Sequence, residues 1–161
     1  DAGHAVTIGI LESLEPTEQF DAITMWDVVE HVPDPLGLLS AARERLAPQG
    51  RLWLATPNVD GLFPQASLRV AGKVGRWPHP EPPYHLIQFS ERTLRHTLDQ
   101  AGFAQIDVTH ERIPLGFTFG SREVLLADPK RLAYTAVFAP LAIVGPWVNQ
   151  GDTMIVSARP T

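Results

Sequence analysis

Residues 20–35 read FDAITMWDVVEHVPDP, and this stretch decides the fold. Its first part, Phe20–Trp26, is an apolar run with the length of one buried strand. From Pro35 onward the apolar residues recur at spacings of three and four, which predicts a helix with one buried face. Pro48-Gln49-Gly50 ends this helix, and residues 51–56 predict a second strand. A strand, a helix and a strand in this order indicate a parallel pair and an α/β domain. The buried helical face should contain Leu36, Leu39, Ala42 and Leu46.

The flanking segments predict further elements. Residues 5–10 form a short apolar run that indicates a strand. Residues 59–83 contain many prolines and glycines and no sustained period, which indicates a long loop, or a short helix followed by a loop. Ser90 is expected to cap a helix that ends at Gly102. This helix should bury Leu94, Leu98 and Ala101.

The last third of the chain completes the sheet. Residues 106–110 and 153–158 predict two strands that can pair antiparallel. Residues 121–150 between them are rich in Leu, Ala and Val, which indicates one helix and a turn inserted between the strands. We therefore expect a single domain over residues 1–161 with a helical insertion at 121–150.

Composition limits the partners of the protein. The chain has 161 residues, 44% of them hydrophobic, and a formal net charge of −5, which fits one compact domain without a nucleic-acid-binding surface. The absence of cysteine excludes thiol catalysis and cysteine-ligated zinc. The longest apolar run, residues 132–148, is interrupted by Pro140, Gly145 and Pro146, so we expect no transmembrane segment. This run could still rest against lipid or against a partner.

Several short motifs follow one another in a fixed order. EHVPDP ends at Pro35, LAPQG closes the first predicted helix, and TPN begins at Thr56. PYHLIQFS at 83–90, AGF and GDTMIV come later in the chain. In this order they resemble the class I S-adenosylmethionine-dependent methyltransferase superfamily. The resemblance extends from about Gly9 to Ala158, and residues 121–150 are its least typical part.

The glycine-rich turn of that superfamily is absent from the sequence. In the family a first strand enters a G-x-G-x-G turn, and its glycines let the backbone approach the cofactor. The nearest glycine pair here, Gly72 and Gly75, follows no predicted strand. The resemblance therefore implies a truncated Rossmann-like methyltransferase fold, N-terminally incomplete, with a mostly parallel sheet and an antiparallel last strand. The strand at residues 5–10 would then pair at an exposed edge or across a homodimer.

The resemblance also implies where a cofactor would bind. Met25, Trp26 and Asp27 end a parallel strand beside a topological switch point, where open α/β sheets bind ligands. The family uses this place for the methionine end of S-adenosylmethionine, although Met25 and Trp26 could equally be core residues. Leu11 and Glu12 follow the strand at 5–10, where the family contacts the adenine ring.

Asp27, Glu30 and His31 have a D-x-x-E-H spacing that places them on one side of a helical turn. In the ubiquinone-biosynthesis O-methyltransferases comparable residues are associated with a divalent metal, and carboxylates with an imidazole are reasonable ligands. The alternative, which we prefer, is that Glu30 and His31 brace the loop that positions the cofactor. We therefore expect His31 at the cofactor and no bound metal.

His85 is the general-base candidate, because an imidazole can accept a proton from a hydroxyl or an amine near neutral pH. The resemblance places it near the acceptor pocket. Its alternative role is to hydrogen-bond the loop before the Ser90 helix. Trp77 and Tyr84 are the aromatic residues most expected at the acceptor, ahead of Trp53, Trp147 and Phe63. Surface positions are expected for His4, His79, His96 and His110.

Two functions follow from this sequence. The first is S-adenosylmethionine-dependent methyl transfer to a small-molecule acceptor, as part of a longer parent chain, with Asp27 placing the cofactor and His85 assisting deprotonation. The second is a non-catalytic methyltransferase-like binding or structural module, which the missing glycine turn favours. We expect a cytoplasmic protein that is inactive as this chain alone.

Overall fold

The sheet of the protein contains four strands. The computed structural model describes residues 3, 8–11, 18–74 and 85–161. The strands lie in the order β1-β2-β4-β3, with β1 parallel to β2, and with β4 antiparallel to both β2 and β3. The predicted α/β class, the parallel pair and the antiparallel last strand are confirmed, and the arrangement is Rossmann-like. The strands are β1 (Phe20–Trp26), β2 (Leu46–Pro57), β3 (Phe103–Glu111) and β4 (Thr153–Pro160).

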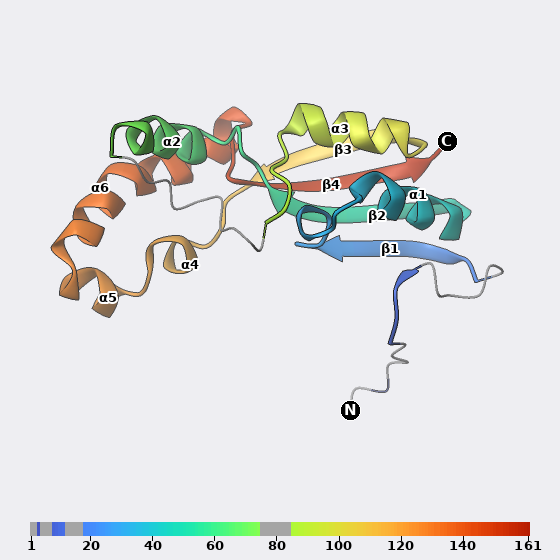
Figure 1. Cartoon of the computed structure of the whole chain (residues 1–161), viewed down its shortest axis with the longest axis horizontal. Coiled ribbons are helices and arrows are strands. Elements are labelled where there is room, and N and C mark those ends of the chain that lie inside the picture. Colours follow the sequence, from blue (N-terminus) through green and yellow to red (C-terminus); the bar gives the residue numbers. More distant parts are fainter. Residues whose placement is uncertain (1–2, 4–7, 12–17, 75–84) are drawn as a thin grey trace.

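One face of the sheet is buried beneath two helices. Side chains alternate along the strands, so that Leu54 of β2 and Val156 of β4 point into the same hydrophobic core. Helices α1 (Pro35–Arg45) and α3 (Glu91–Gln100) cover this face and contact each other (Figure 1). This first core holds the strand ends in place.

Helix α3 begins at the predicted cap. Ser90 Oγ accepts a hydrogen bond from Thr93 N at 3.2 Å, and Thr93 Oγ1 accepts one from Ser90 N at 2.9 Å. This reciprocal arrangement satisfies backbone N–H groups that the first helical turn leaves without partners. Leu94 and Leu98 are fully buried, as predicted.

One residue of the predicted α1 face is exposed. Leu39 and Ala42 are fully buried, but Leu36 is 38% exposed. Leu36 belongs to the first turn of the helix, at the edge of the stripe that Leu39 and Ala42 form. The prediction that Leu46 belongs to this helix is wrong: α1 ends at Arg45, before Pro48-Gln49-Gly50, and Leu46 is buried as the first residue of β2. The apolar stripe of α1 is therefore narrower than predicted.

The predicted strand over residues 5–10 is wrong for its described part. Residues 8–10 form no strand, and Ile8 is 99% exposed. An apolar, β-branched sequence satisfies strand propensity, but a strand also requires a neighbour for its backbone hydrogen bonds. β1 pairs only with β2 among the described residues. Residues 5–7 lie outside them.

A group of helices lies beyond the strand ends (Figure 1). The segment predicted as one helix and a turn over 121–150 contains more helices than expected, because Asp128 and Pro129 end one helix and start the next. The Asp128 carboxylate accepts hydrogen bonds from Lys130 N and Arg131 N, and proline is favoured in a first turn. The elements are α2 (Leu62–Val74), α4 (Leu115–Phe119), α5 (Arg122–Ala127), α6 (Pro129–Val144) and the 3-10 helices η2 (Val29–His31) and η3 (Gly145–Val148).

We call residues 115–148, which contain α4, α5, α6 and η3, the helical arm. The arm packs against α2 through a second core, formed by Phe63, Phe119, Phe138 and Ala142. Within the described residues, one helical stretch, Pro129–Val148, has the length and composition that would allow it to cross a membrane. Its most apolar part has a mean hydropathy of 1.3, and 17% of that part is buried in the protein. Its inner side belongs to the second core.

The loops that follow β2 and precede β4 are in close backbone contact. Asn58 N donates to Asp152 O at 2.9 Å, and Leu62 N donates to Gln150 O at 2.8 Å. A Cβ on Gly61 would lie 2.6 Å from Gly151 O, and a Cβ on Gly151 would collide with the backbone of Glu111. Only glycine allows these two loops and the end of β3 to approach this closely.

We expect Gly151→Ala to lower the free energy of unfolding by about 1–3 kcal/mol, because the added methyl group meets backbone atoms that cannot move away. Gly72→Ala is the matched control, because a Cβ at Gly72 in α2 has no neighbour within 4 Å. The control should raise stability by roughly 0.5–1 kcal/mol through helix propensity. Urea unfolding measures both, and equal effects of the two substitutions would contradict the close packing.

Candidate functional site

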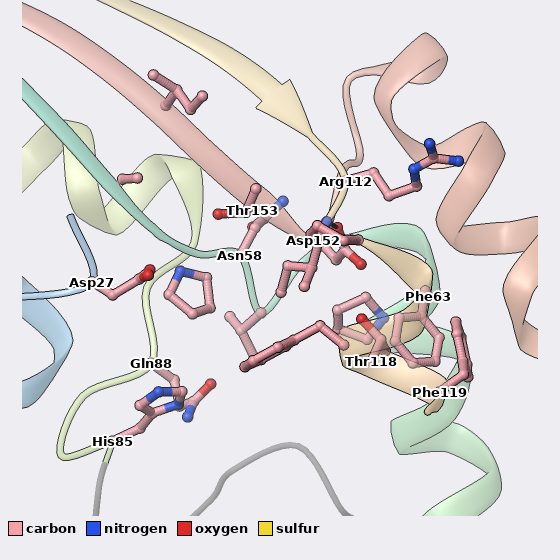
Figure 2. A pocket seen from close by; sticks show the side chains of 18 of the residues that line it. Asp27, Asn58, Phe63, His85, Gln88, Arg112, Thr118, Phe119, Asp152 and Thr153 are labelled. Carbon is pink, nitrogen blue, oxygen red and sulfur yellow. Dashed lines mark hydrogen bonds between the residues drawn. The ribbon is translucent and has the colours of Figure 1, made fainter. Parts of the chain in front are cut away.

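A cavity of about 980 Å³ lies between the strand ends and the helical arm. Its walls come from the C-terminal ends of β1 and β2, the start of β4, the segment before α3, and helices α2, α4 and α6. In Figure 2, Asp27, His85 and Gln88 lie on one side of the cavity and Phe63, Thr118, Phe119 and Arg112 on the other. The volume falls within the range of small-molecule sites.

The end of β1 contributes Trp26 and Asp27. Asp27 N still donates to Ala55 O of β2 at 3.0 Å, but Asp27 has a φ of 52°, in the left-handed region. Aspartate tolerates this conformation better than most residues, and strained positions of this kind concentrate at functional sites. The turn ends the strand directly at the cavity. Met25, one residue earlier, is buried in the first core and does not line the cavity.

Glu30, His31 and His85 form a polar cluster next to Asp27. Leu86 N donates to Glu30 O at 2.9 Å, which fixes the segment before α3 against η2. The ring centroids of His31 and His85 lie 4.9 Å apart. Glu30 is almost fully buried, and its Oε2 accepts a hydrogen bond from Thr56 Oγ1 at 2.9 Å.

One ligand atom from each of these three side chains lies within 4.8 Å of the others. Imidazole nitrogens and a carboxylate oxygen are suitable ligands for a divalent transition metal. The sequence suggested Asp27, Glu30 and His31 as such a set, whereas the structure brings His85 to Glu30 and His31 instead of Asp27.

A chain of hydrogen bonds lies behind the cavity floor. Asn58 lines the cavity, and its Nδ2 donates to Gly151 O at 2.9 Å and lies 3.4 Å from His110 Nδ1. His110 Nε2 lies 2.8 Å from Glu91 Oε2, and this contact and Arg95 lower the pKa of Glu91. The expected surface position of His110 is therefore wrong, because His110 faces α3 from β3 and is buried there.

Aromatic side chains form the wall on the side of the arm. We call Phe63, Phe119, Tyr134 and Phe138 the aromatic cluster; the ring centroids are 5.1 Å apart for Phe63 and Phe119 and 4.5 Å apart for Tyr134 and Phe138. Three of the four, all except Phe138, line the cavity. Burial raises the pKa of Tyr134, and the Ser67 hydroxyl opposes this effect. Phe117, which is 85% exposed, extends the apolar wall toward solvent.

Charged side chains stand within this apolar wall. Asp152 is only 4% exposed, and its Oδ1 accepts a hydrogen bond from Ile113 N at 2.8 Å. Its Oδ2 has no hydrogen-bond partner among the described residues. Burial raises the pKa of Asp152, while the bond from Ile113 N and the charge of Arg112 act in the opposite direction. Arg112 and Arg131 also line the cavity.

Comparison with known sequences identifies the family. A sequence model of the family described as "Methyltransferase domain" matches residues 6–108. The chain belongs to this methyltransferase-domain family. Its match to the ubiquinone biosynthesis O-methyltransferase of Xanthomonas oryzae pv. oryzae (strain PXO99A) is 46% identical over 44 residues, which are 27% of the chain and 18% of that relative. The match to the corresponding enzyme of Histophilus somni is 46% identical over 41 residues, 26% of the chain and 17% of the relative.

Solved structures share the fold. A Thermotoga maritima protein, described as a SAM-dependent methyltransferase and possible histamine N-methyltransferase, superposes with a TM-score of 0.57 at 17% identity, over 95% of this chain and 62% of that one. A SAM-dependent methyltransferase from Archaeoglobus fulgidus gives 0.53 at 20% identity, over 92% and 62%. The chain thus spans less than two thirds of the length of each of these two structures.

The structure brings together part of the predicted site of this methyltransferase domain. Trp26, Asp27, His31 and His85 line the cavity. Leu11 packs against the first core instead, and Glu12 lies outside the described residues. Four further candidates also lie outside the described residues: His4, Trp77, His79 and Tyr84. His96 is exposed, as predicted.

Sequence reasoning missed the polar residues of the arm side. Arg112 directly follows β3, and Asp152 directly precedes β4. Their position at the two ends of the segment between these strands was the one sign in the sequence that they could line the site. Among the other aromatic candidates Phe63 lines the cavity, Trp147 is exposed, and Trp53 lies under Arg51, whose Cζ is 5.7 Å from the ring centroid.

Asp152→Asn should change how stability depends on pH. The folded protein holds the Asp152 proton more tightly than the unfolded chain, so ionisation of this carboxyl lowers the free energy of unfolding as pH rises from about 4 through the raised pKa. Asparagine retains an oxygen for Ile113 N and does not ionise. The stability of the variant relative to the parent protein should therefore increase between pH 4 and pH 7 in urea unfolding. A difference that is the same at both pH values would contradict the burial of a carboxylate at this position.

Proposed function

We propose that this methyltransferase domain transfers a methyl group from S-adenosylmethionine to a small molecule bound in the cavity. The observation that carries the proposal is the cavity at the carboxyl ends of β1 and β2, where open α/β sheets bind their ligands, in a chain of this family. S-adenosylmethionine would supply an electrophilic methyl group on a positively charged sulfur. The cavity has polar groups at the strand ends and an apolar wall at the arm, so that it offers each reactant a different side.

The side chains at the strand ends fit such a cofactor. The Asp27 carboxylate can accept hydrogen bonds from an ammonium or a hydroxyl group, and the exposed Trp26 ring can lie against a positive charge. The left-handed turn at Asp27 ends β1 directly at the cavity. The sequence contains no glycine-rich turn, so the fit is supported on this side of the ligand only.

His85 would act on the acceptor. Its ring lines the cavity beside His31, on a segment that the hydrogen bonds from Leu86 N and Ile87 N to Glu30 O hold in place. An imidazole there can take the proton from an acceptor hydroxyl or amine. Most of the rate enhancement would come from holding the two reactants in line. A divalent cation held by Glu30, His31 and His85 is the alternative use of the same side chains.

A non-catalytic binding module is the second candidate function. The absence of a G-x-G-x-G turn from the sequence favours it, because this turn normally lets the backbone approach the cofactor. Such a module would use the same cavity for a small ligand without methyl transfer. Binding of the cofactor product distinguishes the two functions.

The test is isothermal titration calorimetry of the protein with S-adenosylhomocysteine. We expect binding, and we expect Asp27→Asn to weaken it about tenfold, because a charged hydrogen-bond acceptor becomes neutral. Asp107→Asn is the matched control, because Asp107 is an exposed carboxylate on β3 that does not line the cavity. Its affinity should equal that of the parent protein.

Equal weakening by both substitutions would refute the role of Asp27. Absence of binding, in this chain and in any longer natural chain that contains it, would refute the methyltransferase function and leave the binding module.

A further inference from the structure

Asn58 lies between two cavities of the protein. It lines the cavity of the candidate site (Figure 2), and it also lines a second cavity of about 540 Å³, whose walls include residues of α3 and His110 of β3. Among the described residues, Asn58 is the one that both cavities share. It is only 2% exposed, so its polar atoms need hydrogen-bond partners inside the protein.

Two backbone groups fix the orientation of the Asn58 amide. Its Oδ1 accepts a hydrogen bond from Asp60 N at 3.1 Å, and its Nδ2 donates to Gly151 O at 2.9 Å. A reversed amide would set Nδ2 against the N–H group of Asp60 and Oδ1 against the carbonyl of Gly151, so both contacts would become repulsive. The second N–H of Nδ2 therefore has His110 Nδ1, at 3.4 Å, as its partner.

The other ring nitrogen of His110 meets a carboxylate. His110 Nε2 lies 2.8 Å from Glu91 Oε2, and this hydrogen bond, followed by the one from Arg95, lowers the pKa of Glu91. A carboxylate that stays ionised can only accept hydrogen bonds. Nε2 must therefore carry a proton.

One form of the imidazole ring satisfies both contacts. The neutral ring with its proton on Nε2 donates to Glu91 and accepts from Asn58. The other neutral tautomer would set a lone pair against the carboxylate and an N–H group against an N–H group. The doubly protonated ring would keep the contact to Glu91 but would set its Nδ1–H against Asn58. Asn58 cannot turn its amide to relieve this repulsion without losing the bonds to Asp60 N and Gly151 O.

We propose that His110 is a positioning residue of the cavity, and that its neutral form with a proton on Nε2 holds Asn58 and the loop before β4 in place. Asn58 passes this effect on, because its backbone N donates to Asp152 O and its side chain donates to Gly151 O. Asp152 lines the cavity beside this contact. Protonation of His110 would weaken the contact between the loops, so this wall of the cavity is sensitive to pH.

The proposal rests on the proposed function only where a ligand is concerned, because the tautomer of His110 can be measured without one. The charged residues around the ring line the second cavity with it: Asp60, Glu91, Arg92 and Arg95. Arg95 Nε donates to Glu91 Oε1 at 2.7 Å. A substitution of His110 therefore leaves the Glu91 carboxylate with an ionic partner.

Nitrogen chemical shifts of the His110 ring test the tautomer in the unaltered protein. At neutral pH we expect a proton on Nε2 and none on Nδ1, whereas a histidine that only fills space would not select one nitrogen. As the pH falls toward 5, the range in which histidines commonly titrate, the side-chain amide signals of Asn58 should shift together with protonation of the ring. A proton on Nδ1 at neutral pH, or ring protonation that leaves the Asn58 signals unchanged, would overturn the proposal.

Two substitutions separate the two contacts of the ring. His110→Asn places an amide oxygen near the position of Nδ1, so it can accept from Asn58 without titrating. His110→Gln reaches toward Glu91 and removes the acceptor from Asn58. Loss of an acceptor from a buried donor should accelerate deuterium exchange of the backbone amides of Asn58 and Leu62 about tenfold in His110→Gln. His110→Asn should keep their exchange slow.

His96→Asn is the control, because His96 is an exposed histidine of α3 that lines neither cavity. Urea unfolding of each variant corrects the exchange rates for changes in global stability. Equal acceleration in His110→Asn and His110→Gln, or none in His110→Gln, would refute the role of Nδ1. The titration with S-adenosylhomocysteine is separate: its failure would contradict the proposed methyl transfer alone, and the wrong tautomer would contradict only the role of His110.

Discussion

The close contact between the loops at the strand ends is the constraint on which the cavity depends. Gly61 and Gly151 let the loop after β2 and the loop before β4 touch through their backbones, and Asn58 joins them with hydrogen bonds from its side chain and its backbone N–H. A larger residue at either glycine would separate the loops, and the hydrogen bonds of Asn58 would then lack partners in a buried position. Asn58 and Asp152 can line one cavity because this contact fixes the distance between the loops that carry them.

The chemistry of the cavity follows from its place between two hydrophobic cores. The first core, under α1 and α3, fixes the strand ends that carry the polar groups. The second core, in which Phe63 and Phe119 meet, fixes the arm that carries the aromatic wall and Arg131. A ligand in the cavity therefore meets the polar groups of the strand ends on one side and a mainly aromatic wall that includes Arg131 on the other, and each set is held by its own packing.

The sequence predicted well what depends on local pattern. The strand Phe20–Trp26 and the Ser90 cap are confirmed, because an apolar run and capping chemistry involve residues close together in the sequence. The antiparallel pairing of the last two strands is confirmed as well. The burial of His110 was not predicted, since it depends on Glu91 in an element that precedes β3 in sequence. Arg131 became a candidate only when the fold placed the start of α6 against Phe119. The strand predicted for residues 8–10 from their apolar, β-branched composition is absent, because a strand needs a neighbouring strand that composition does not specify.

The presence of two cores has a consequence for local opening. The arm is joined to the sheet through short loops and packs mainly on α2, so it can act as a separate cooperative unit of lower stability than the sheet. Backbone amides of α4 and α6 would then exchange with solvent deuterium through openings that leave β2 and β4 protected. A ligand that touches both walls would slow exchange in the arm most, because it couples the less stable unit to the more stable one.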